Sequence, residues 1–500
     1  CWMTKDNDSN KRITAMKPTN LLFIMADEHN RAMMSCSGHP LVKTPNLDAL
    51  AARGTRFTNA YTNCPICVPA RASIATGRYN HDIRYWDNAT AYDGRIKGWG
   101  HRLQDAGVPV ESIGKLHYRR DEDPLGLDVR QVPMYIKDGV GSISAALRDP
   151  MPPFDPASKE KPGFASKACG GESNYTKYDL KVADLACEWL AGDVAADGEN
   201  PWCLYVSFLS PHYPLTVPEP FFSLYDPADM PDPKLDPEGG YERHPWVDVL
   251  ALRQPHANGL TPEKSRAAMA AYLGLCSFID HQIGRVLEAL ETAGLTENTR
   301  IIYTSDHGEN AGARGLWGKS VMYEESTGIP MMVAGPDVPV GQICDTPVSL
   351  VDLYPTITQA IGIAPVDAEV DLPGNSLLDI AAAGSDPERI AFSQYHASAS
   401  PTGGFMLRKG KYKFNYYVDY PPELFDLEAD LEEENDIAGD PAYADICKEY
   451  EALLRRIVDP ELADRQAKDD QNAIIEFHGG REKILRDKLG VQSYTPAPEV

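Results

Sequence analysis

The chain has 500 residues and a formal net charge of -25, which opposes binding to nucleic acid and to anionic membranes. We therefore expect neither as a partner. Its 43% hydrophobic and 24% charged residues are typical of a globular protein with room for one large α/β domain and a smaller one. Any anionic ligand would need a site made locally positive by a metal ion, arginine or lysine.

The N-terminus and the cysteines bear on the cellular compartment. Residues 1–17 are polar and mixed in charge, without the apolar segment of a secretion signal. The 10 cysteines have no spacing typical of a disulfide framework, and no apolar run is long enough to cross a bilayer. We therefore expect reduced thiols, no membrane contact and a cytoplasmic location.

The first apolar run predicts a buried strand that ends in acidic residues. Residues 20–26 are apolar rather than alternating, which is typical of a parallel strand covered on both faces. Asp27 and Glu28 follow directly, at the strand end where open α/β sheets bind ligands. Their carboxylate oxygens suit a divalent cation, and a solvated loop with two ordinary acids is the alternative.

The next segments predict a helix, a strand and a sharp turn into a second helix. A helix is expected from Pro45, and an alternating strand over 55–61 leads towards the sequence CVPAR at 67–71. Cys67 is expected near the start of the second helix, where amide donors favour negative charge on a ligand or nucleophile. Cys64 and Cys67 also form a CxxC pair, so a redox pair, half of a zinc site and buried core thiols are alternatives.

A lysine and a histidine follow the next predicted strand, over 108–113. Lys115 and His117 are two residues apart, so on an extended segment both project to one side and could reach one anion; a surface pair is the alternative. Residues 85–88 could line a pocket or lie in the core. The Pro-, Gly- and Asp-rich segment 121–171 is predicted to be an excursion over the sheet on the substrate side.

Two later strands end in further candidate site residues. The buried strand over 202–209 leads to His212 between two prolines, which suits a positioned acid or base, with a structural histidine as the alternative. A long helix from Pro262 precedes the strand 299–305. That strand ends in Asp306 and His307, which can complete a metal site begun by Asp27 and Glu28. Lys319 adds a cation downstream.

The pattern changes near residue 386. Short alternating segments over 389–417 predict antiparallel strands, and residues 443–458 predict an amphipathic helix. We predict a catalytic α/β domain over 18–385, a C-terminal α+β subdomain over 386–460, and a polar tail over 461–500 on a neighbouring surface or at a subunit interface.

Several of these motifs resemble the signatures of the formylglycine-dependent sulfatases of the alkaline phosphatase superfamily. CVPAR followed by Thr-Gly resembles the C-x-P-[SA]-R signature, GKLH at 114–117 resembles the second signature, and SDHG at 305–308 resembles a third element. The resemblance implies an α/β fold with a large mixed, mostly parallel sheet sandwiched by helices. It also implies a smaller C-terminal antiparallel-sheet subdomain.

The resemblance further implies a role for each candidate residue. Cys67 would be oxidised to formylglycine by a formylglycine-generating enzyme, and the hydrate would attack sulfur. The implied ligands of one divalent cation are Asp27, Glu28, Cys67, Asp306 and His307. Arg71, Lys115 and Lys319 would hold sulfate oxygens. His212, with Lys319, would protonate the leaving oxygen, and His117 would take a proton from the second hydroxyl.

Departures from the commonest sulfatase pattern bear on the metal and the substrate. Glu28 and His307 replace the usual Asp and Asn, and the Asp-His pair is similar to choline sulfatases and phosphonate monoester hydrolases. A nitrogen ligand makes Mn²⁺ a competitor to Ca²⁺. Retention of Lys115 and His117 favours small anionic sulfate monoesters, as in arylsulfatases. A phosphonate monoester or phosphodiester hydrolase and a non-catalytic binding or redox protein are the alternatives; a homodimer or homotetramer is expected.

Overall fold

A computed structural model describes residues 19–196, 200–487 and 495–499. The polar N-terminal stretch and residues 488–494 and 500 of the predicted tail lie outside the described residues. The largest sheet is made of β1 (Asn20–Asp27), β2 (Gly54–Phe57), β4 (Val110–Lys115), β5 (Val129–Met134), β7 (Cys203–Pro211), β9 (Thr299–Ser305), β10 (Met331–Ala334) and β11 (Gln342–Cys344). Its strand order is β11-β2-β10-β9-β1-β7-β4-β5.

The centre of this sheet is parallel and one side is mixed. β1 pairs in parallel with β7 and β9, and β4 continues in parallel from β7 to β5. β10 is antiparallel to both β9 and β2. The prediction of a large mixed, mostly parallel sheet is therefore confirmed.

Strand register brings distant parts of the sequence to one edge of the sheet. Ala26 pairs with Ser305, so the residues that follow them, Asp27 and Asp306, are neighbours. Asp27 in turn pairs with Pro211, the last residue of β7. Because parallel strands share the direction of the chain, each of these strands delivers its next residues to the same place.

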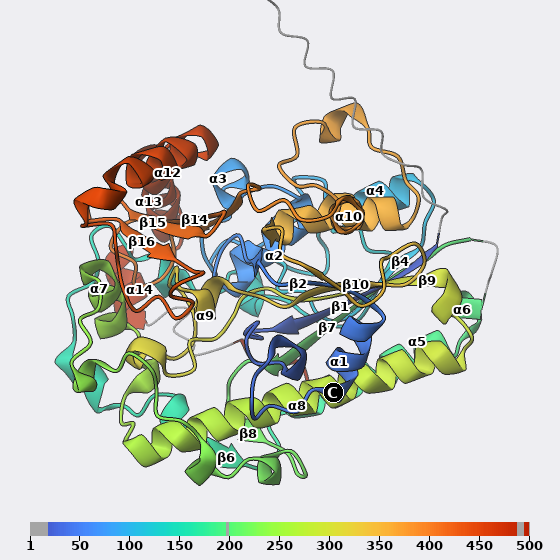
Figure 1. Ribbon diagram of the computed structural model, residues 1–500, viewed down its shortest axis with the longest axis horizontal. Helices are drawn as coiled ribbons and strands as arrows, with labels where there is room; N and C mark the ends of the chain where they lie inside the picture. The colour runs from blue at the N-terminus through green and yellow to red at the C-terminus, as the bar shows by residue number, and fades with distance from the viewer. Residues whose placement is uncertain (1–18, 197–199, 488–494, 500) are drawn as a thin grey trace, which may run out of the picture.

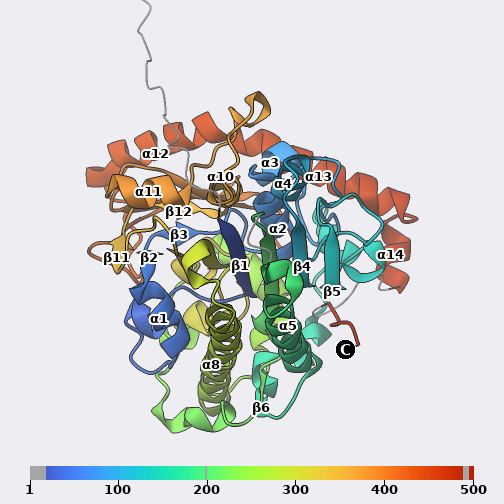
Figure 2. The same ribbon diagram turned by 90° about the vertical axis from the view of Figure 1, so that its right-hand side faces the viewer.

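Helices cover both faces of the sheet, as Figures 1 and 2 show. On one face lie α1 (Pro45–Ala52), α5 (Asn174–Leu190) and α8 (Pro262–Thr292). On the other lie α2 (Cys67–Thr76), α4 (Trp99–Asp105), α10 (Leu353–Ala360) and α11 (Leu377–Ala383). No helix within the described ranges is both long enough and apolar enough to cross a bilayer.

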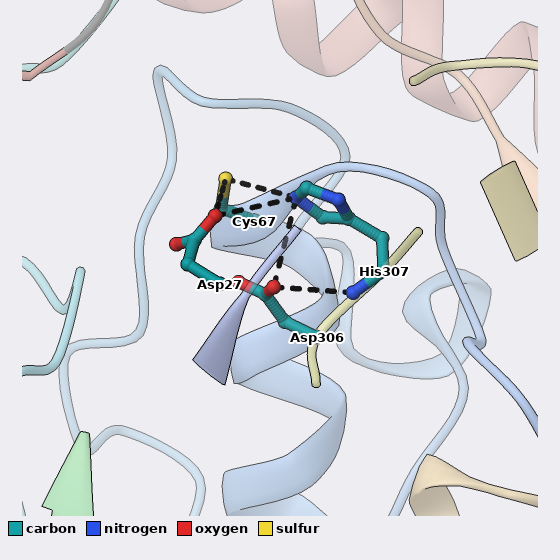
Figure 3. Close-up of side chains that lie close together, drawn as sticks. All are labelled: Asp27, Cys67, Asp306 and His307. Atoms are coloured by element: carbon teal, nitrogen blue, oxygen red, sulfur yellow. Dashed lines mark hydrogen bonds and ion pairs between the residues drawn. The ribbon is translucent and has the colours of Figure 1, made fainter. Parts of the chain in front are cut away.

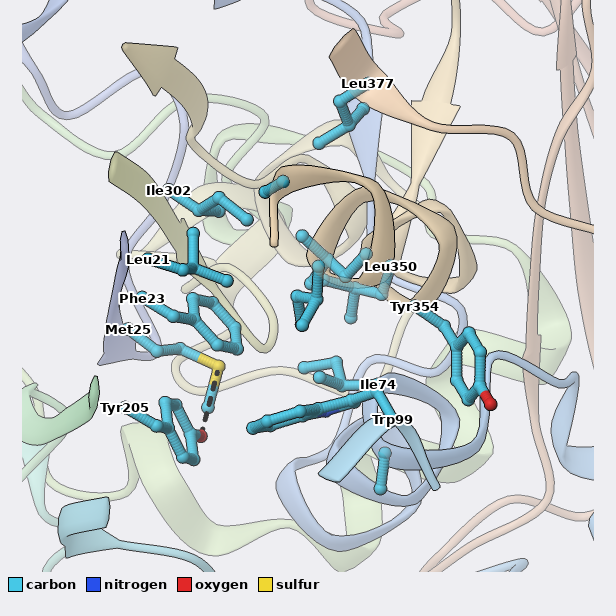
Figure 4. Close-up of a cluster of buried hydrophobic side chains, with 14 of the residues drawn as sticks. Leu21, Phe23, Met25, Ile74, Trp99, Tyr205, Ile302, Leu350, Tyr354 and Leu377 are labelled. Atoms are coloured by element: carbon cyan, nitrogen blue, oxygen red, sulfur yellow. Dashed lines mark hydrogen bonds between the residues drawn. The ribbon is translucent and has the colours of Figure 1, made fainter. Parts of the chain in front are cut away.

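The central strand β1 contributes to both hydrophobic cores. Leu21, Phe23 and Met25 face one core and the alternate residues face the other, which explains why residues 21–26 are all apolar. In the first core the rings of Phe23 and Tyr205 stack with centroids 4.7 Å apart, and Trp99 packs edge-on beside them (Figure 4). The strand that carries Asp27 is thus held rigidly from both sides.

The prediction for segment 121–171 was wrong at one point. Residues Val129–Met134 form β5, the edge strand of the main sheet. The strand is mostly half-exposed and contains Pro133, which an edge strand tolerates because one side of its backbone needs no partner. Such a strand lacks the apolar signal of the central ones.

A smaller antiparallel sheet lies at the C-terminal side, as predicted. It is formed by β13 (Ala391–Tyr395), β14 (Gly404–Lys409), β15 (Tyr412–Tyr417) and β16 (Glu423–Asp426). The helices α12 (Ala444–Ile457), α13 (Pro460–Phe477) and α14 (Arg481–Asp487) follow it. Trp86 is buried and donates its indole N–H to Asp470 on α13 at 2.7 Å, so this side chain belongs to the core.

A buried ion network joins the loops after β9 to the segment after the small sheet. Arg314 is 1% exposed and donates to both carboxylate oxygens of Glu325, at 2.9 and 3.1 Å. It also donates to the backbone carbonyls of Glu432 and Glu433. Lys234 adds a second cation 2.6 Å from Glu325.

We expect Glu325→Gln to lower the free energy of unfolding by about 3 kcal/mol at pH 7, because it removes the nearer of the two carboxylates that pair with the buried Arg314. Burial alone would raise the pKa of Glu325, but Arg314 and Lys234 outweigh it and lower that pKa below its ordinary value of 4.5. The stabilisation is therefore complete above that value and is lost as the pH falls from it through the lowered pKa of about 2. Urea unfolding at pH 7 and pH 3 measures both effects.

The matched control is Asp371→Asn, which removes an exposed ion pair with Arg78. This variant should unfold at the wild-type urea concentration. An unchanged midpoint for Glu325→Gln at pH 7 would contradict a stabilising role for the network.

Candidate active site

Four potential ligand side chains converge where β1, β9 and α2 meet. Asp27 ends β1, Asp306 and His307 follow β9, and Cys67 is the first residue of α2. All four are buried, and one ligand atom from each lies within 4.8 Å of the others. The Cys67 Sγ is 3.1 Å from His307 Nε2 and 3.6 Å from Asp27 Oδ1 (Figure 3).

The start of α2 fixes the position of Cys67. Ile66 is extended, with φ -160° and ψ 140°, and the helix begins at Cys67 as the sequence predicted. The helix ends at Gly77, whose φ of 66° favours glycine, with its N–H bonded to the Ser73 carbonyl. All residues of the helix are buried, so its N-terminal partial positive charge is little screened by water.

Arg71 fixes both aspartates at once. It lies one turn after Cys67 on the same helix face, donating Nε–H to Asp306 at 2.8 Å and Nη2–H to Asp27 at 3.2 Å. Its Nη1 donates to the Lys115 carbonyl and to the Ser207 hydroxyl. Most of the N–H donors of Arg71 are therefore bonded to groups of the protein, and the side chain holds the two carboxylates in place.

Glu28 lies beside Lys319 and His212. Its Oε2 accepts a hydrogen bond from Lys319 Nζ at 2.8 Å and lies 3.1 Å from His212 Nε2. Asp27, Glu28 and His212 form a second group within 4.8 Å. The structure therefore groups Glu28 with Lys319 and His212, whereas the other predicted metal ligands gather around Cys67.

Lys115 and His117 have different partners. β4 ends at Lys115, whose ammonium contacts the Asp27 carboxylate. His117 has φ 55°, and its Nε2 lies 2.8 Å from the Thr495 hydroxyl. The expectation of one continuous extended segment was wrong, because this left-handed residue breaks the alternation of side chains.

Burial and neighbouring charge set the protonation of the thiol and of Asp27. Burial, and then the nearby Asp27, raises the pKa of the Cys67 thiol to about 12, so the unmodified residue is a thiol at neutral pH. Burial alone would raise the pKa of Asp27, but the positive charges of Lys115 and Arg71 outweigh it and hold that pKa well below its ordinary value. Asp27 is therefore a carboxylate.

The two histidines are neutral at physiological pH. Burial, and then Lys115, lowers the pKa of His117 well below its ordinary value. Burial, and then Lys319, does the same to His212. A neutral imidazole can accept a proton, which is what a general base requires.

The four-residue cluster fits a divalent cation. Asp27 and Asp306 are both fully buried and lie on neighbouring strands, so a positive charge between them would offset their repulsion. Two carboxylates and an imidazole are a donor set that Ca²⁺ or Mn²⁺ can use.

Two supporting residues were not singled out from the sequence. Glu309 accepts hydrogen bonds from the backbone N–H groups of Ala311 and Gly318, and so holds the loop that carries Lys319. The Tyr213 ring lies under Lys319, with its centroid 5.1 Å from Nζ. Glu309 directly follows the motif at 305–308 and Tyr213 directly follows His212, which was the available signal.

Comparison with known proteins agrees with this geometry. Residues 19–363 match the sulfatase family, and residues 312–459 match the C-terminal part of N-sulphoglucosamine sulphohydrolase. The chain belongs to the sulfatase family. It is therefore a member of a family of enzymes that hydrolyse sulfate esters, as the sequence motifs indicated.

Relatives of this sulfatase include both sulfate and phosphonate ester hydrolases. A choline-sulfatase of Rhizobium meliloti is 31% identical over 433 residues, covering 86% of this chain and 84% of the relative. Arylsulfatase K of Danio rerio is 28% identical over 469 residues, covering 88% and 84%. The structure of a phosphonate monoester hydrolase of Agrobacterium radiobacter superimposes with a TM-score of 0.72 at 25% identity, covering 88% and 95%.

We expect the variants Asp306→Asn and Glu28→Gln to differ in metal content. Asp306→Asn removes a charged ligand of the four-residue cluster and should lose most of the bound cation. Glu28→Gln should retain it, because the Glu28 carboxylate lies with Lys319 and His212. Elemental analysis by mass spectrometry after dialysis measures the stoichiometry. Equal loss from both variants would make Glu28 a ligand.

Proposed function

We propose that this sulfatase hydrolyses sulfate monoesters with an aryl or small-alkyl leaving group, using formylglycine formed from Cys67 and one divalent cation. The observation that carries the proposal is the buried convergence of Cys67 with Asp27, Asp306 and His307. When present, formylglycine supplies a hydrated aldehyde as oxygen nucleophile, and the cation supplies positive charge for the ester oxygens.

Arginine and lysine side chains orient the carboxylates of the site. Arg71 orients Asp27 and Asp306, the carboxylates that would bind the cation. Lys115 contacts Asp27 from the side of β4. An ammonium has three donors, so Lys319, bonded to Glu28, can also meet a sulfate oxygen. These three positively charged side chains would let an anion bind although the protein as a whole is negatively charged.

The two histidines would divide the proton transfers. His212 Nδ1 lies 2.6 Å from the Tyr213 carbonyl, which can only accept, so Nδ1 carries the hydrogen. In the neutral ring Nε2 then has no hydrogen. It would first accept a proton from the pair formed by Lys319 and Glu28, whose Oε2 lies 3.1 Å away, and would then pass it to the leaving oxygen. Neutral His117 would take a proton when sulfate is expelled.

The protonation state of Cys67 argues against direct thiolate catalysis. With its pKa raised to about 12, the thiol is almost wholly protonated at neutral pH and is a weak nucleophile. Oxidation to an aldehyde removes this obstacle. The proposal therefore includes a formylglycine-generating enzyme as maturation partner. It also keeps the expectations of a cytoplasmic location and of a homodimer or homotetramer.

Intact-peptide mass spectrometry tests the modification. In a host with the maturation enzyme, the peptide that contains residue 67 should be about 18 Da lighter than the cysteine form, whereas a disulfide would remove about 2 Da. Cys67→Ala should abolish turnover of an aryl sulfate while retaining bound metal. Retained turnover in this variant would refute the nucleophile.

A phosphonate monoester or phosphodiester hydrolase is the second candidate, supported by the structural similarity and by the Asp306-His307 pair. Steady-state kinetics with an aryl sulfate and an aryl phosphonate monoester decide between them. We expect the higher kcat/KM for the sulfate, because the chain keeps Lys115 and His117 of the second sulfatase signature. A higher value for the phosphonate would favour the second candidate.

A further inference from the structure

The C-terminal segment Thr495–Glu499 lies against the active site of its own chain. The Thr495 hydroxyl is 2.8 Å from His117 Nε2, and the Thr495 carbonyl accepts a hydrogen bond from the Tyr175 hydroxyl at 2.5 Å. Ala497 packs against the core formed by the β1–β7 face and α5. The segment therefore contacts a site residue from which it is separated by 378 positions in the sequence.

Tyr175 connects the same segment to the second histidine. It lies at the start of α5, is 2% exposed, and its ring packs on His212 with centroids 5.8 Å apart. Thr495 thus contacts His117 directly and His212 through Tyr175. A single residue of the C-terminal segment is therefore connected to both histidines to which we assign proton transfer.

His117 depends on Thr495 for its orientation. Its backbone N–H is bonded to the Met134 carbonyl, but its ring has one hydrogen-bonding contact among the described residues, that to Thr495. Its Nδ1 is buried and has no hydrogen-bond partner among the residues that the structure describes. The side chain is 4% exposed, so water replaces such a contact poorly.

We propose that Thr495 is a positioning residue for His117 and that the C-terminal segment forms one wall of the active site. The hydroxyl fixes the imidazole ring and, by accepting the Nε2 hydrogen, leaves the lone pair on Nδ1. Tyr175 anchors the Thr495 backbone so that the hydroxyl is held in place. The catalytic consequence rests on the proposed function, in which His117 accepts a proton.

Thr495→Val and Thr495→Ser test the hydroxyl in the full-length, formylglycine-containing enzyme. Valine keeps the shape and removes the hydrogen bond, so kcat for an aryl sulfate should fall roughly tenfold while KM changes little. Serine restores the hydroxyl and should return kcat to near the wild-type value. Equal losses for both variants, or a change confined to KM, would overturn the positioning role.

Tyr175→Phe tests the anchor while keeping the ring on His212. It should lower kcat in the same direction, and the double variant with Thr495→Val should be less impaired than the product of the single effects, because both act through one contact. Thr292→Val, at an exposed position at the end of α8, is the matched control and should keep wild-type kinetics. Fully multiplicative effects would overturn the proposed coupling.

A readout without catalysis separates this inference from the proposed function. In protein with ¹⁵N-labelled histidine, with His117 assigned by His117→Gln, Thr495→Val should shift the ring-nitrogen signals of His117, and Thr292→Val should not. If the wild-type enzyme lacks sulfatase activity, the proposed function fails while these signals still report the contact. Unchanged His117 signals, or a higher kcat in Thr495→Val, would show that the segment does not position the histidine.

Discussion

The structure depends on one buried interaction, the pairing of Arg71 with Asp27 and Asp306. Two carboxylates without solvent contact would be costly if they were uncompensated. Arg71 meets both, at 3.2 and 2.8 Å, and is carried by the helix that begins at Cys67. The same contact therefore balances charge and fixes the spacing between the two aspartates and the cysteine. A shift of α2 along the sheet would break all three relationships.

This local charge balance explains how an acidic protein could receive an anion. The formal charge of -25 repels anions at long range, yet Lys115, Lys319 and Arg71 are all buried around one cluster. In such a water-poor setting, fixed charges act more strongly than they do at the surface. Glu28 and Asp27 hold two of these lysines in place. The site thus depends on the pairs Lys319–Glu28 and Lys115–Asp27. A bound cation and an ester would replace some of these contacts.

Regions far along the chain support this arrangement. Arg314 binds the segment after the small C-terminal sheet, and Asp470 on α13 accepts a hydrogen bond from Trp86. Beyond them, Thr495 returns to the strand end that carries His117. The late part of the sequence therefore contributes stability and one wall of the site, although the motifs that indicate the chemistry all lie before residue 320.

The sequence by itself predicted the central strands of the sheet and the residues of the cluster, because buried parallel strands are apolar, GKLH and SDHG lie at the ends of such strands, and CVPAR begins a helix. Register was enough to make Asp27 and Asp306 neighbours once β1 and β9 were parallel partners. Tertiary structure alone decided that Glu28 lies with Lys319 and His212, that His117 is left-handed, and that Thr495 contacts it. Side-chain direction after a strand end depends on single backbone angles, and contacts between distant segments depend on packing, neither of which has a periodic signal in the sequence.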